Sequence, residues 1–544
     1  MPFLAQRTVP ISTQDLLSWT FDNPPYDLDK PIYLDCHDPS ISFSSRQSKT
    51  AIRKIAAGLQ NEGLQRGETV CIHSFNDVHY PLLVLGIIAA GGVFTGTNPG
   101  YTTYELAHHL KASDTKIIIA EPEILGAIEK AAKAIGVQDP RIFVFDNAHN
   151  SGKIPAGYRS WRSLLDHGET DWPRFDDLQT TQNTTAMLLF SSGTSGLPKP
   201  AIATHYNLVA QQTLVFEHPP VPYERRRIMS LPVFHAASAP NCHISPLRGG
   251  YPTYIMRRFE VEKFLRSIEE FSITEWIMVP PQVVAIINSP LGNRYSWDSV
   301  EQIQIGAAPL DKKPQARFKA LVSKDIPVTQ GWGMSETCCI GVRFPYPEKD
   351  ETGSIGRWID NIDVKIIDED GNDITGYDVL GEVCVRGPTV SPGYFGEQEA
   401  TKNSWKADGW FHTGDIMYCD SKTRLWYIVD RRKELIKVRA FQVAPPEIEG
   451  VLLTHPAITD AAVIGVYGPD NTELPRAYVV RAPSSEGQAL TEDAVKKLVE
   501  ESLAKYKWLA GGVVFTDSIP KTASGKILKR LLREQASREL KGKL

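Results

Sequence analysis

Hydrophobic and polar residues follow two rhythms along this chain, the spacing of amphipathic helices and the short apolar runs of buried strands. The segment 49–62 has apolar residues at the intervals of one helix face. Short β-branched runs, which are typical of buried strands, occur at 69–73, 116–120 and 142–145. Helical and strand patterns alternate over most of the length, and this alternation predicts α/β layers.

The same alternation repeats further along the chain. It predicts a helix at 261–271 and strands at 251–256, 275–279 and 303–305. Two such rounds predict two related subdomains, each containing a sheet.

The pattern changes at about Ile362 into short alternating strands with turns, which predicts a small β-rich unit. A compact α+β tail follows. The stretch 430–433 is charged, and a charged, exposed joint of this kind is where domains move against each other. We therefore expect an N-terminal domain over 1–430 and a mobile C-terminal domain over 431–544, with a hinge near 430–433.

Composition narrows the class of protein. With 544 residues the chain is too long for one core, and 42% hydrophobic with 23% charged residues is ordinary for a globular enzyme. The formal net charge of −5 argues against nucleic acid as the main partner. Seven cysteines without C-x-x-C spacing favour reduced thiols over disulfides or zinc. The longest apolar run, 81–94, is too short to span a bilayer and predicts a buried helix entering a strand.

The two ends of the chain bear on its location. The N-terminus lacks the charged and apolar regions of a secretory signal, and we expect a cytoplasmic enzyme. The last three residues, 542–544, read Gly-Lys-Leu and approximate the peroxisomal Ser-Lys-Leu address without its serine. We interpret them as the basic end of a helix, with peroxisomal import as the alternative.

The segment 189–199 carries the first candidate chemistry. A short predicted strand leads into hydroxyl-bearing residues and glycines, and a lysine closes the segment. Hydroxyls, free backbone N–H groups and glycines with φ > 0 form a nest for an anion, here a polyphosphate. A Ser/Gly surface loop is the alternative. The spacing matches neither a Walker A loop nor a hydrolase elbow. The candidate phosphate-binding residues are Ser191, Ser192, Gly193, Thr194, Ser195 and Lys199.

Four further motifs follow this loop in order. They are Gly306-Ala307-Ala308-Pro309, Gln330-Gly331-Trp332-Gly333-Met334-Ser335-Glu336, the segment 409–415 ending in Asp415, and the segment 520–526 ending in Lys526. Together with the loop they closely resemble the adenylate-forming superfamily of acyl-CoA synthetases, adenylation domains and luciferases. The resemblance covers about residues 40–535. Details at 91–99, 231–235 and 441–445 are most similar to 4-coumarate–CoA ligases and to aryl or medium-chain acyl-CoA ligases.

The resemblance implies both a fold and a reaction. The fold is a large N-terminal domain of two related α/β sheet subdomains plus a small β-rich subdomain, followed by a small mobile α+β C-terminal domain. The reaction consumes ATP with Mg²⁺, converts a carboxylic acid into an acyl-adenylate with release of pyrophosphate, and transfers the acyl group to coenzyme A. The acid is expected to be aryl, phenylpropanoid-like or of medium chain length. Neither nucleic acid nor integral membrane association is implied, and the oligomeric state stays open.

The resemblance also implies how ATP is held. The loop would grip the β- and γ-phosphates, the segments 306–309 and 330–333 would surround the adenosine, and Ser335 would lie with Glu336 near the α-phosphate. Trp332 would stack on the base, with a core tryptophan as the alternative. Asp415 would accept both ribose hydroxyls and Arg431 would add positive charge there, a surface salt bridge being the alternative. Glu336 would be catalytic and bind Mg²⁺, although alone it would be read as a surface charge.

Three further residues take catalytic roles by the same resemblance. Lys526 would offset the negative charge that builds on the carboxyl–phosphate bridge; an isolated lysine there would be a solvated surface residue. His235 would stand at the mouth of the acyl pocket, with a satisfied core histidine as the alternative, and the small Ala237 beside it suggests a wide pocket. The tail would pivot between half-reactions and present Lys437, Arg439 and Ala440 to the thioester step.

Several positions leave the accepting thiol open. Pro200 and Ala440 stand where the family usually has glycine. Arg258 is a candidate for the phosphates of coenzyme A, with a plain surface cation as the alternative. Lys433 and Gln442 complete the candidate cofactor-binding set. The rival functions are a stand-alone adenylation enzyme that loads a carrier-protein thiol and an oxidative luciferase-like enzyme. A non-enzymatic binding protein is the least supported alternative, because Glu336, Asp415 and Lys526 are all present.

Overall fold

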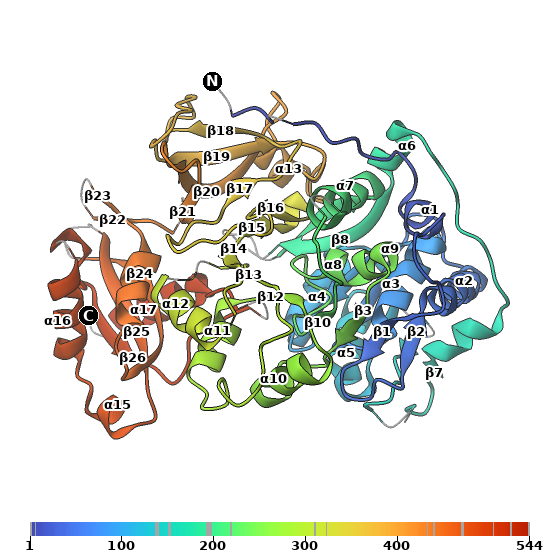
Figure 1. Cartoon of the computed structure of the whole chain (residues 1–544), viewed down its shortest axis with the longest axis horizontal. Coiled ribbons are helices and arrows are strands. Elements are labelled where there is room, and N and C mark those ends of the chain that lie inside the picture. The colour runs from blue at the N-terminus through green and yellow to red at the C-terminus, as the bar shows by residue number, and fades with distance from the viewer. Residues whose placement is uncertain are drawn as a thin grey trace.

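The computed structural model describes most of the chain. The described residues are 3–5, 7–136, 141–150, 154–191, 198–217, 220–308, 310, 312–322, 324–431, 434–438, 441–468, 473–503, 505–522 and 525–541. Figure 1 shows the first large sheet with its helices in blue and teal, most of the second in green apart from its blue N-terminal strands, the β-rich part above them in yellow-brown and the C-terminal part at the left in orange and red. This arrangement agrees with the fold class that the sequence predicts.

The first large sheet is made of short strands whose β-branched side chains are buried on both faces. Its order is β7-β6-β5-β3-β4-β8-β9, with neighbouring strands parallel except β9, which runs antiparallel to β8. The strands are β3 (Thr69–His73), β4 (Val93–Thr97), β5 (Thr115–Ala120), β6 (Ile142–Val144), β7 (Arg159–Ser160), β8 (Thr185–Ser191) and β9 (Lys199–Thr204). Burial on both faces is the usual reason for such apolar runs in parallel sheets.

Helices cover this sheet where the sequence predicts them. The helix expected at 49–62 begins earlier, because Ser44 and Gln47 form a capping box at its N-terminus. The apolar run 81–94 is a fully buried helix followed by a strand. The helices of the first part of the chain are α1 (Leu16–Phe21), α2 (Ser45–Asn61), α3 (Tyr80–Ala89), α4 (Thr103–Ala112), α5 (Leu125–Ala134), α6 (Leu178–Asn183) and α7 (His205–Gln211).

The second large sheet has the order β14-β13-β12-β10-β11-β1-β2, again parallel except for the edge strand β2. Its strands are β1 (Pro31–Asp35), β2 (Ser42–Ser44), β10 (Arg227–Met229), β11 (Thr253–Ile255), β12 (Glu275–Met278), β13 (Gln302–Ile305) and β14 (Val328–Gln330). Its helices are α8 (Ala239–His243), α9 (Ser245–Gly249), α10 (Val261–Glu270), α11 (Pro280–Ile287) and α12 (Lys312–Leu321). The second round of predicted strands is therefore confirmed, and the N-terminal strand β1 joins it from a distance.

Two antiparallel sheets form the β-rich part. Their strands are β15 (Trp332–Met334), β16 (Cys339–Arg343), β17 (Arg357–Trp358), β18 (Asp363–Ile367), β19 (Gly381–Arg386), β20 (Phe411–Cys419) and β21 (Trp426–Arg431), with helix α13 (Gln398–Ser404). Trp332, Trp358 and Trp426 meet edge-to-face in its core, an arrangement that aromatic rings favour.

The C-terminal part has a hydrophobic core of its own. Its strands are β22 (Ile436–Val438), β23 (Phe441–Val443), β24 (Ile458–Tyr467), β25 (Glu473–Arg481) and β26 (Gly512–Phe515). Its helices are α14 (Pro445–Leu452), α15 (Ser485–Ala489), α16 (Glu492–Ser502) and α17 (Lys529–Lys541). A separate core is what an α+β unit of this kind requires.

One expectation about the boundary is wrong. Asp430 and Arg431 are not an exposed joint, because β21 continues through both residues and Asp430 is buried. Their charges have partners elsewhere in the fold, Lys529 for Asp430 and Asp415 for Arg431. The division of the chain near 430 and the mobility of the tail stay predictions.

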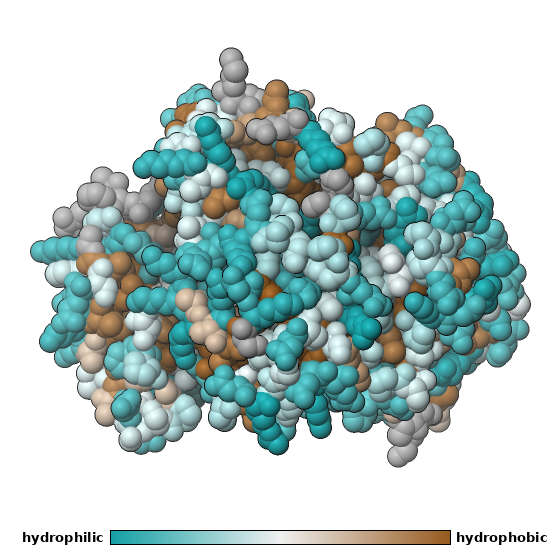
Figure 2. Space-filling view, in the orientation of Figure 1, coloured by the Kyte–Doolittle hydropathy of each residue, from teal (hydrophilic) through white to brown (hydrophobic). Residues whose placement is uncertain are grey.

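The surface and the thiols agree with the composition. Hydrophilic residues dominate the face in Figure 2. No helix in the described part of the chain is both long and apolar enough to cross a bilayer. All seven cysteines lie among the described residues, and they are buried and free.

Candidate active site

The predicted phosphate loop begins at the end of β8 and returns at the start of β9. Ser191 and Lys199 lie opposite each other in the antiparallel register of these strands, so the two ends of the loop are fixed. Residues 192–197, and with them Ser192, Gly193, Thr194 and Ser195, lie outside the described residues. The Lys199 ammonium lies 5.6 Å from the ring centre of Tyr394.

Tyr394 connects this loop to Glu336. The segment 393–395 runs beside β9, where its backbone pairs with Pro200 and Ile202. The Tyr394 hydroxyl donates a hydrogen bond of 2.6 Å to Glu336 Oε1. Burial and the neighbouring Glu336 charge raise the pKa of Tyr394, so its hydroxyl stays a donor.

Glu336 is fixed at one oxygen and open at the other. Its residue is only 2% exposed, and Oε2 is buried with no hydrogen-bond partner among the described residues. The described residues contain no cluster of three or more His, Cys, Asp or Glu side chains suited to a metal ion. A single unsatisfied carboxylate oxygen fits Mg²⁺, which proteins often bind through one or two carboxylates together with substrate phosphates.

Asp415 lies on β20 with one carboxylate oxygen hydrogen-bonded and the other, Oδ1, buried without a hydrogen-bond partner among the described residues. Its Oδ2 accepts a hydrogen bond of 2.7 Å from the indole N–H of Trp332, and its Oδ1 lies 3.2 Å from Nε of Arg431 on the neighbouring strand. Burial raises the pKa of Asp415, and the Arg431 charge opposes this. Trp332 is itself buried against Trp358. The indole N–H of Trp332 therefore orients the Asp415 carboxylate, and this role does not depend on whether the Trp332 ring also stacks on adenine.

Lys526 reaches the same region from the far end of the chain. Its backbone N–H donates to the Thr522 hydroxyl, while the Thr522 N–H donates to the Lys526 carbonyl, and this closes a tight turn. The neighbouring Gly525 has φ +82°, and a Cβ there would lie 2.6 Å from Cγ of Pro281 at the start of α11. The turn is thus packed directly against the second large sheet's helical layer.

The charges of the site act on one another. Burial and the Arg431 charge lower the pKa of Lys526 to about 8, while Asp415, Glu336 and Glu434 oppose the shift. Burial and the Lys526 charge lower the pKa of His235 to about 4. The backbone N–H of Ala237 donates to Nδ1 of His235, which leaves the neutral ring's proton on Nε2. Lys526, His235, Glu336, Asp415 and Arg431 therefore interact in one region, where Glu336 and Asp415 are buried and the other three are half-buried.

The lowered pKa predicts a pH dependence. Because the pKa of Lys526 lies near 8 rather than at 10.5, the ammonium form is lost as the pH rises through about 8. We expect the rate of acid-dependent ATP–pyrophosphate exchange, measured at low ATP concentration from pH 6.5 to 9.5, to fall above that value. The Lys526→Arg variant keeps its charge over the whole pH range, so its exchange rate, although lower, should not change with pH. An equally steep fall of the exchange rate in this variant would contradict the assignment of the pH dependence to Lys526.

The predicted adenine wall is built from close backbone contacts. A Cβ at Gly306 would lie 3.6 Å from the Gly331 carbonyl, and one at Gly333 would overlap the Cys339 carbonyl. Ala307 has φ +67°, a strained conformation of the kind found at functional sites. Ala308 continues this turn, whereas Pro309 lies outside the described residues.

Gln330 holds the segment that follows this wall, and Ser335 contacts the end of β8. The Gln330 amide exchanges two hydrogen bonds of 2.8 Å with the backbone of Leu310 and donates to Gln315. Its side chain therefore clamps the segment that follows the adenine turn. The Ser335 hydroxyl donates at 3.4 Å to the carbonyl of Phe190 at the end of β8.

Other predicted residues lie elsewhere. The Lys437 side chain is 60% exposed, with its ammonium 3.5 Å from Glu369, so the structure does not bring it to Lys526. The Arg258 guanidinium lies 3.8 Å from the ring centre of Phe75. Only the backbone of Gln442 is described, opposite Lys437. Lys433, Arg439, Ala440 and the terminal 542–544 lie outside the described residues.

Comparison with known proteins identifies the class. Residues 24–395 match the AMP-binding enzyme family, and residues 447–526 match the AMP-binding enzyme C-terminal domain. The chain belongs to the AMP-binding enzyme family. It is accordingly an enzyme of the adenylate-forming superfamily, as its motifs predict.

Curated relatives match along the whole chain. The phenylacetyl-CoA ligase epaB of Aspergillus niger is 50% identical over 543 residues, covering 99% of this chain and all of that protein. The acyl-CoA ligase azaF of Aspergillus niger is 50% identical over 535 residues, covering 98% of this chain and all of that protein. Among solved structures, ATP-bound MatB from Rhodopseudomonas palustris matches with a TM-score of 0.82 and 25% identity, covering 96% of this chain and 99% of that one.

Proposed function

We propose that this protein is an ATP-dependent carboxylic acid–CoA ligase that releases AMP and pyrophosphate and acts on an aryl or medium-chain acid. The observation that carries the proposal is the arrival of Lys526 from the C-terminal part beside Asp415, Glu336 and His235 of the N-terminal part. An acidic pair, a cation and a neutral histidine in one region suit the transfer of an adenylyl group to a carboxylate. The two relatives at 50% identity are both acid–CoA ligases by name.

The first half-reaction needs positive charge at a defined point. A carboxylate attacks the α-phosphorus of ATP, and negative charge accumulates on the oxygens around that phosphorus. Lys526 supplies a half-buried cation for this charge, where the low dielectric makes it more effective than in water. Asp415, oriented by Trp332 and Arg431, would receive the ribose hydroxyls.

Glu336 would hold the magnesium ion. Its Oε2 has no other partner among the described residues, while Tyr394 holds Oε1 in place. Bound there together with the phosphates, Mg²⁺ would neutralise the charge of the departing pyrophosphate. Ser191 and Lys199, at the two ends of the phosphate loop, would hold the β- and γ-phosphates.

The second half-reaction transfers the acyl group to the thiol of coenzyme A. When the thiol attacks the acyl carbon of the adenylate, AMP departs as a good leaving group, so this step needs access for the thiol more than a strong acid or base. Lys437 and Arg258 are the residues of this chain proposed to serve it. Since Lys437 is exposed away from Lys526, its use requires the C-terminal part to turn, which separates the two chemistries in time.

The acid is proposed to be aromatic or of medium chain length. His235 lies beside the small residues Ala236 and Ala237 at the expected mouth of the acyl pocket, which leaves room for a ring. The relative named for phenylacetyl-CoA makes phenylacetate the first acid to test. A cytoplasmic location, with peroxisomal import as the alternative, stays a prediction.

The test is a screen of acids for AMP release. Purified enzyme with ATP and Mg²⁺ is given phenylacetate, phenylpropanoid acids or medium-chain fatty acids, with and without coenzyme A. We expect acid-dependent AMP and pyrophosphate, and a CoA thioester in stoichiometric amount when coenzyme A is present. Lys422→Ala, which removes an exposed lysine, is the matched control for variants of Lys526. Pyrophosphate formation without any thioester would instead favour a carrier-protein thiol.

A further inference from the structure

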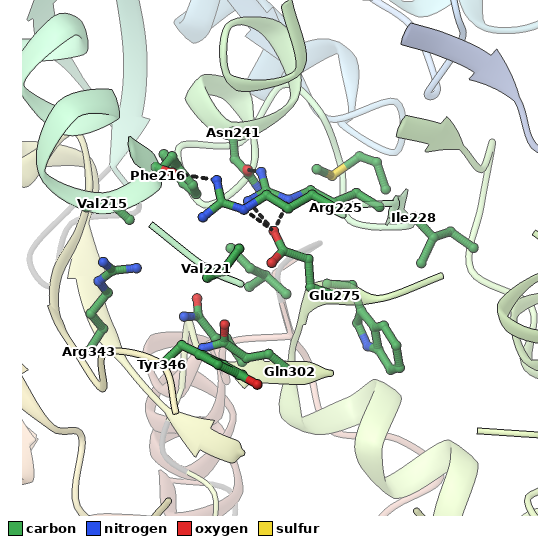
Figure 3. Close-up of a pocket in the computed structure, with 15 residues that line it drawn as sticks. Val215, Phe216, Val221, Arg225, Ile228, Asn241, Glu275, Gln302, Arg343 and Tyr346 are labelled. Carbon is green, nitrogen blue, oxygen red and sulfur yellow. Dashed lines mark hydrogen bonds and ion pairs between the residues drawn. The ribbon is translucent and has the colours of Figure 1, made fainter. Parts of the chain in front are cut away.

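A polar cavity lies in the N-terminal part, lined by residues other than those assigned to the candidate site. It is bounded by the C-terminal end of the π-helical segment η3 (Gln212–Glu217) and by β10, β12, β13 and β16. Three arginines line it, namely Arg225, Arg227 and Arg343, against one carboxylate, Glu275. Figure 3 shows Arg225 close to Glu275, with Arg343 on the opposite side of the cavity and Gln302 and Tyr346 below.

One of the arginines, Arg227, has its donors engaged by other side chains of the protein. Arg227 binds Glu275 Oε1 through Nε at 2.6 Å and through Nη2 at 2.5 Å, and its Nη1 donates to Asn241 and to the Tyr251 hydroxyl. The other oxygen of Glu275 accepts a hydrogen bond from the Tyr223 hydroxyl. Arg227 and Glu275 therefore balance each other in charge, and Arg225 forms only a longer ion pair with the same carboxylate oxygen, at 3.6 Å.

Arg225 is left with an unsatisfied donor. Its Nη1 donates to the Phe216 carbonyl, but its Nε is buried without a hydrogen-bond partner among the described residues and lies 3.6 Å from Glu275. A buried donor of a charged group in this state costs free energy unless something accepts from it.

Arg343 adds a further positive charge. Burial and the charge of Arg225 lower the pKa of Arg343 to about 10, and Glu275 and Asp360 offset this in part. Asp360 does not line the cavity. The lining thus holds more cationic than anionic groups, and it attracts an anion.

The cavity lies near both the predicted adenine wall and the expected mouth of the acyl pocket. On β13, Gln304 lines the cavity two residues before Gly306, which is about 7 Å along a strand. A Cβ at Gly331 would lie 3.9 Å from Cβ of Arg343. Asn241, which lines the cavity, lies in α8, four residues after Ala237 in the turn that precedes this helix. An acid held beside Ala237 would therefore extend its far end toward this cavity.

We propose that this cavity is the far end of the acyl-binding site and that it binds a second carboxylate of the acid substrate. This inference rests on the proposed ligase function. The planar guanidinium of Arg225 matches a carboxylate in geometry, and the carboxylate would accept from its unsatisfied Nε. The substrate class becomes an aromatic or medium-chain acid that is ionised at both ends.

The test compares matched acids. The rate constant kcat/KM for AMP release is measured with 4-carboxyphenylacetate and with 4-methylphenylacetate, which lacks the second charge. We expect the diacid to be preferred by about tenfold or more, the usual size of a hydrogen bond to a charged group. Arg225→Met should remove this preference, while Arg226→Met, which changes an exposed neighbouring arginine, should keep it. A preference for the methyl compound in the unaltered enzyme would overturn the inference.

Binding measurements separate this inference from the ligase function. Calorimetric titration of the unaltered enzyme with 4-carboxyphenylacetate needs no turnover, and Arg343→Gln provides a second variant if Arg225→Met does not fold. Binding that both arginine variants weaken, without AMP release from any acid, would support the cavity and contradict the ligase proposal. AMP release from neutral acids, with no binding of the diacid, would support the ligase and contradict the cavity.

Discussion

Replacing Lys526 with alanine should lower acid-dependent ATP–pyrophosphate exchange by at least about a hundredfold, the usual effect of removing one charge-stabilising donor. Lys526 is half-buried, and its charge interacts with those of Arg431, Asp415 and Glu336 and with His235. No other lysine among the described residues shares this surrounding, so water has to replace the cation. The loss should fall on kcat more than on the binding of ATP, because the charge that Lys526 stabilises grows during the reaction.

The second half-reaction discriminates between a chemical and a structural role for Lys526. When synthetic acyl-adenylate and coenzyme A are supplied, Lys526→Ala should form thioester at a rate within a few-fold of the unaltered enzyme. Lys422→Ala controls for the loss of a lysine, and the melting temperature shows whether the variant is folded. Equal loss in both half-reactions would contradict the assigned role.

Replacing Lys529 with methionine should destabilise the C-terminal part by about 3 kcal/mol, the usual cost of leaving buried charges without their partner. Lys529 is 5% exposed, with its ammonium 3.2 Å from Glu449 and 3.7 Å from Glu434. Burial works against this charge, but Glu449, Asp430 and Glu434 together raise the pKa of Lys529. Methionine has a side chain of similar length but no charge, so the three carboxylates would face one another without a cation between them.

The loss of stability in Lys529→Met should be larger at high pH than at low pH. Burial raises the pKa of Asp430 to about 7, so in the folded protein this carboxylate is charged only above that value. A carboxylate with a raised pKa destabilises the fold above its unfolded pKa and is relieved as the pH falls. Urea unfolding at pH 8 and pH 6 should therefore show a smaller difference between Lys529→Met and the unaltered protein at pH 6. Arg538→Met, at an exposed position of the same helix, should change the free energy of unfolding little. An equal loss of stability at both pH values in Lys529→Met would contradict the role given to Asp430.

Much of the fold was predictable, because buried parallel strands and their covering helices carry their own periodicity. The strands at 69–73 and 303–305 have the expected type and nearly the expected bounds. Long-range pairing was not predictable: β1, from the N-terminus, lies in the second sheet beside β11, and nothing in its local pattern names that partner.

The site shows the same division. The motifs predicted that Lys526, Glu336 and Asp415 belong to one site, since each lies in a short recognisable segment, and the structure brings the three charges together; their roles stay predictions. Tyr394, which holds Glu336, was missed because it stands in an irregular Gly- and Pro-containing stretch without periodicity. Asp430 was expected to be exposed because its charge is visible in the sequence, whereas its partner Lys529 lies in a distant helix.

The fit of Gly525 against Pro281 has a consequence for the reaction cycle. Since a methyl group at this position would overlap the proline ring, we expect any residue larger than glycine at 525 to displace the turn that carries Lys526 from α11. If the C-terminal part turns between the half-reactions as the sequence predicts, such a variant should lose speed in forming the adenylate and keep its speed in transferring the acyl group to coenzyme A.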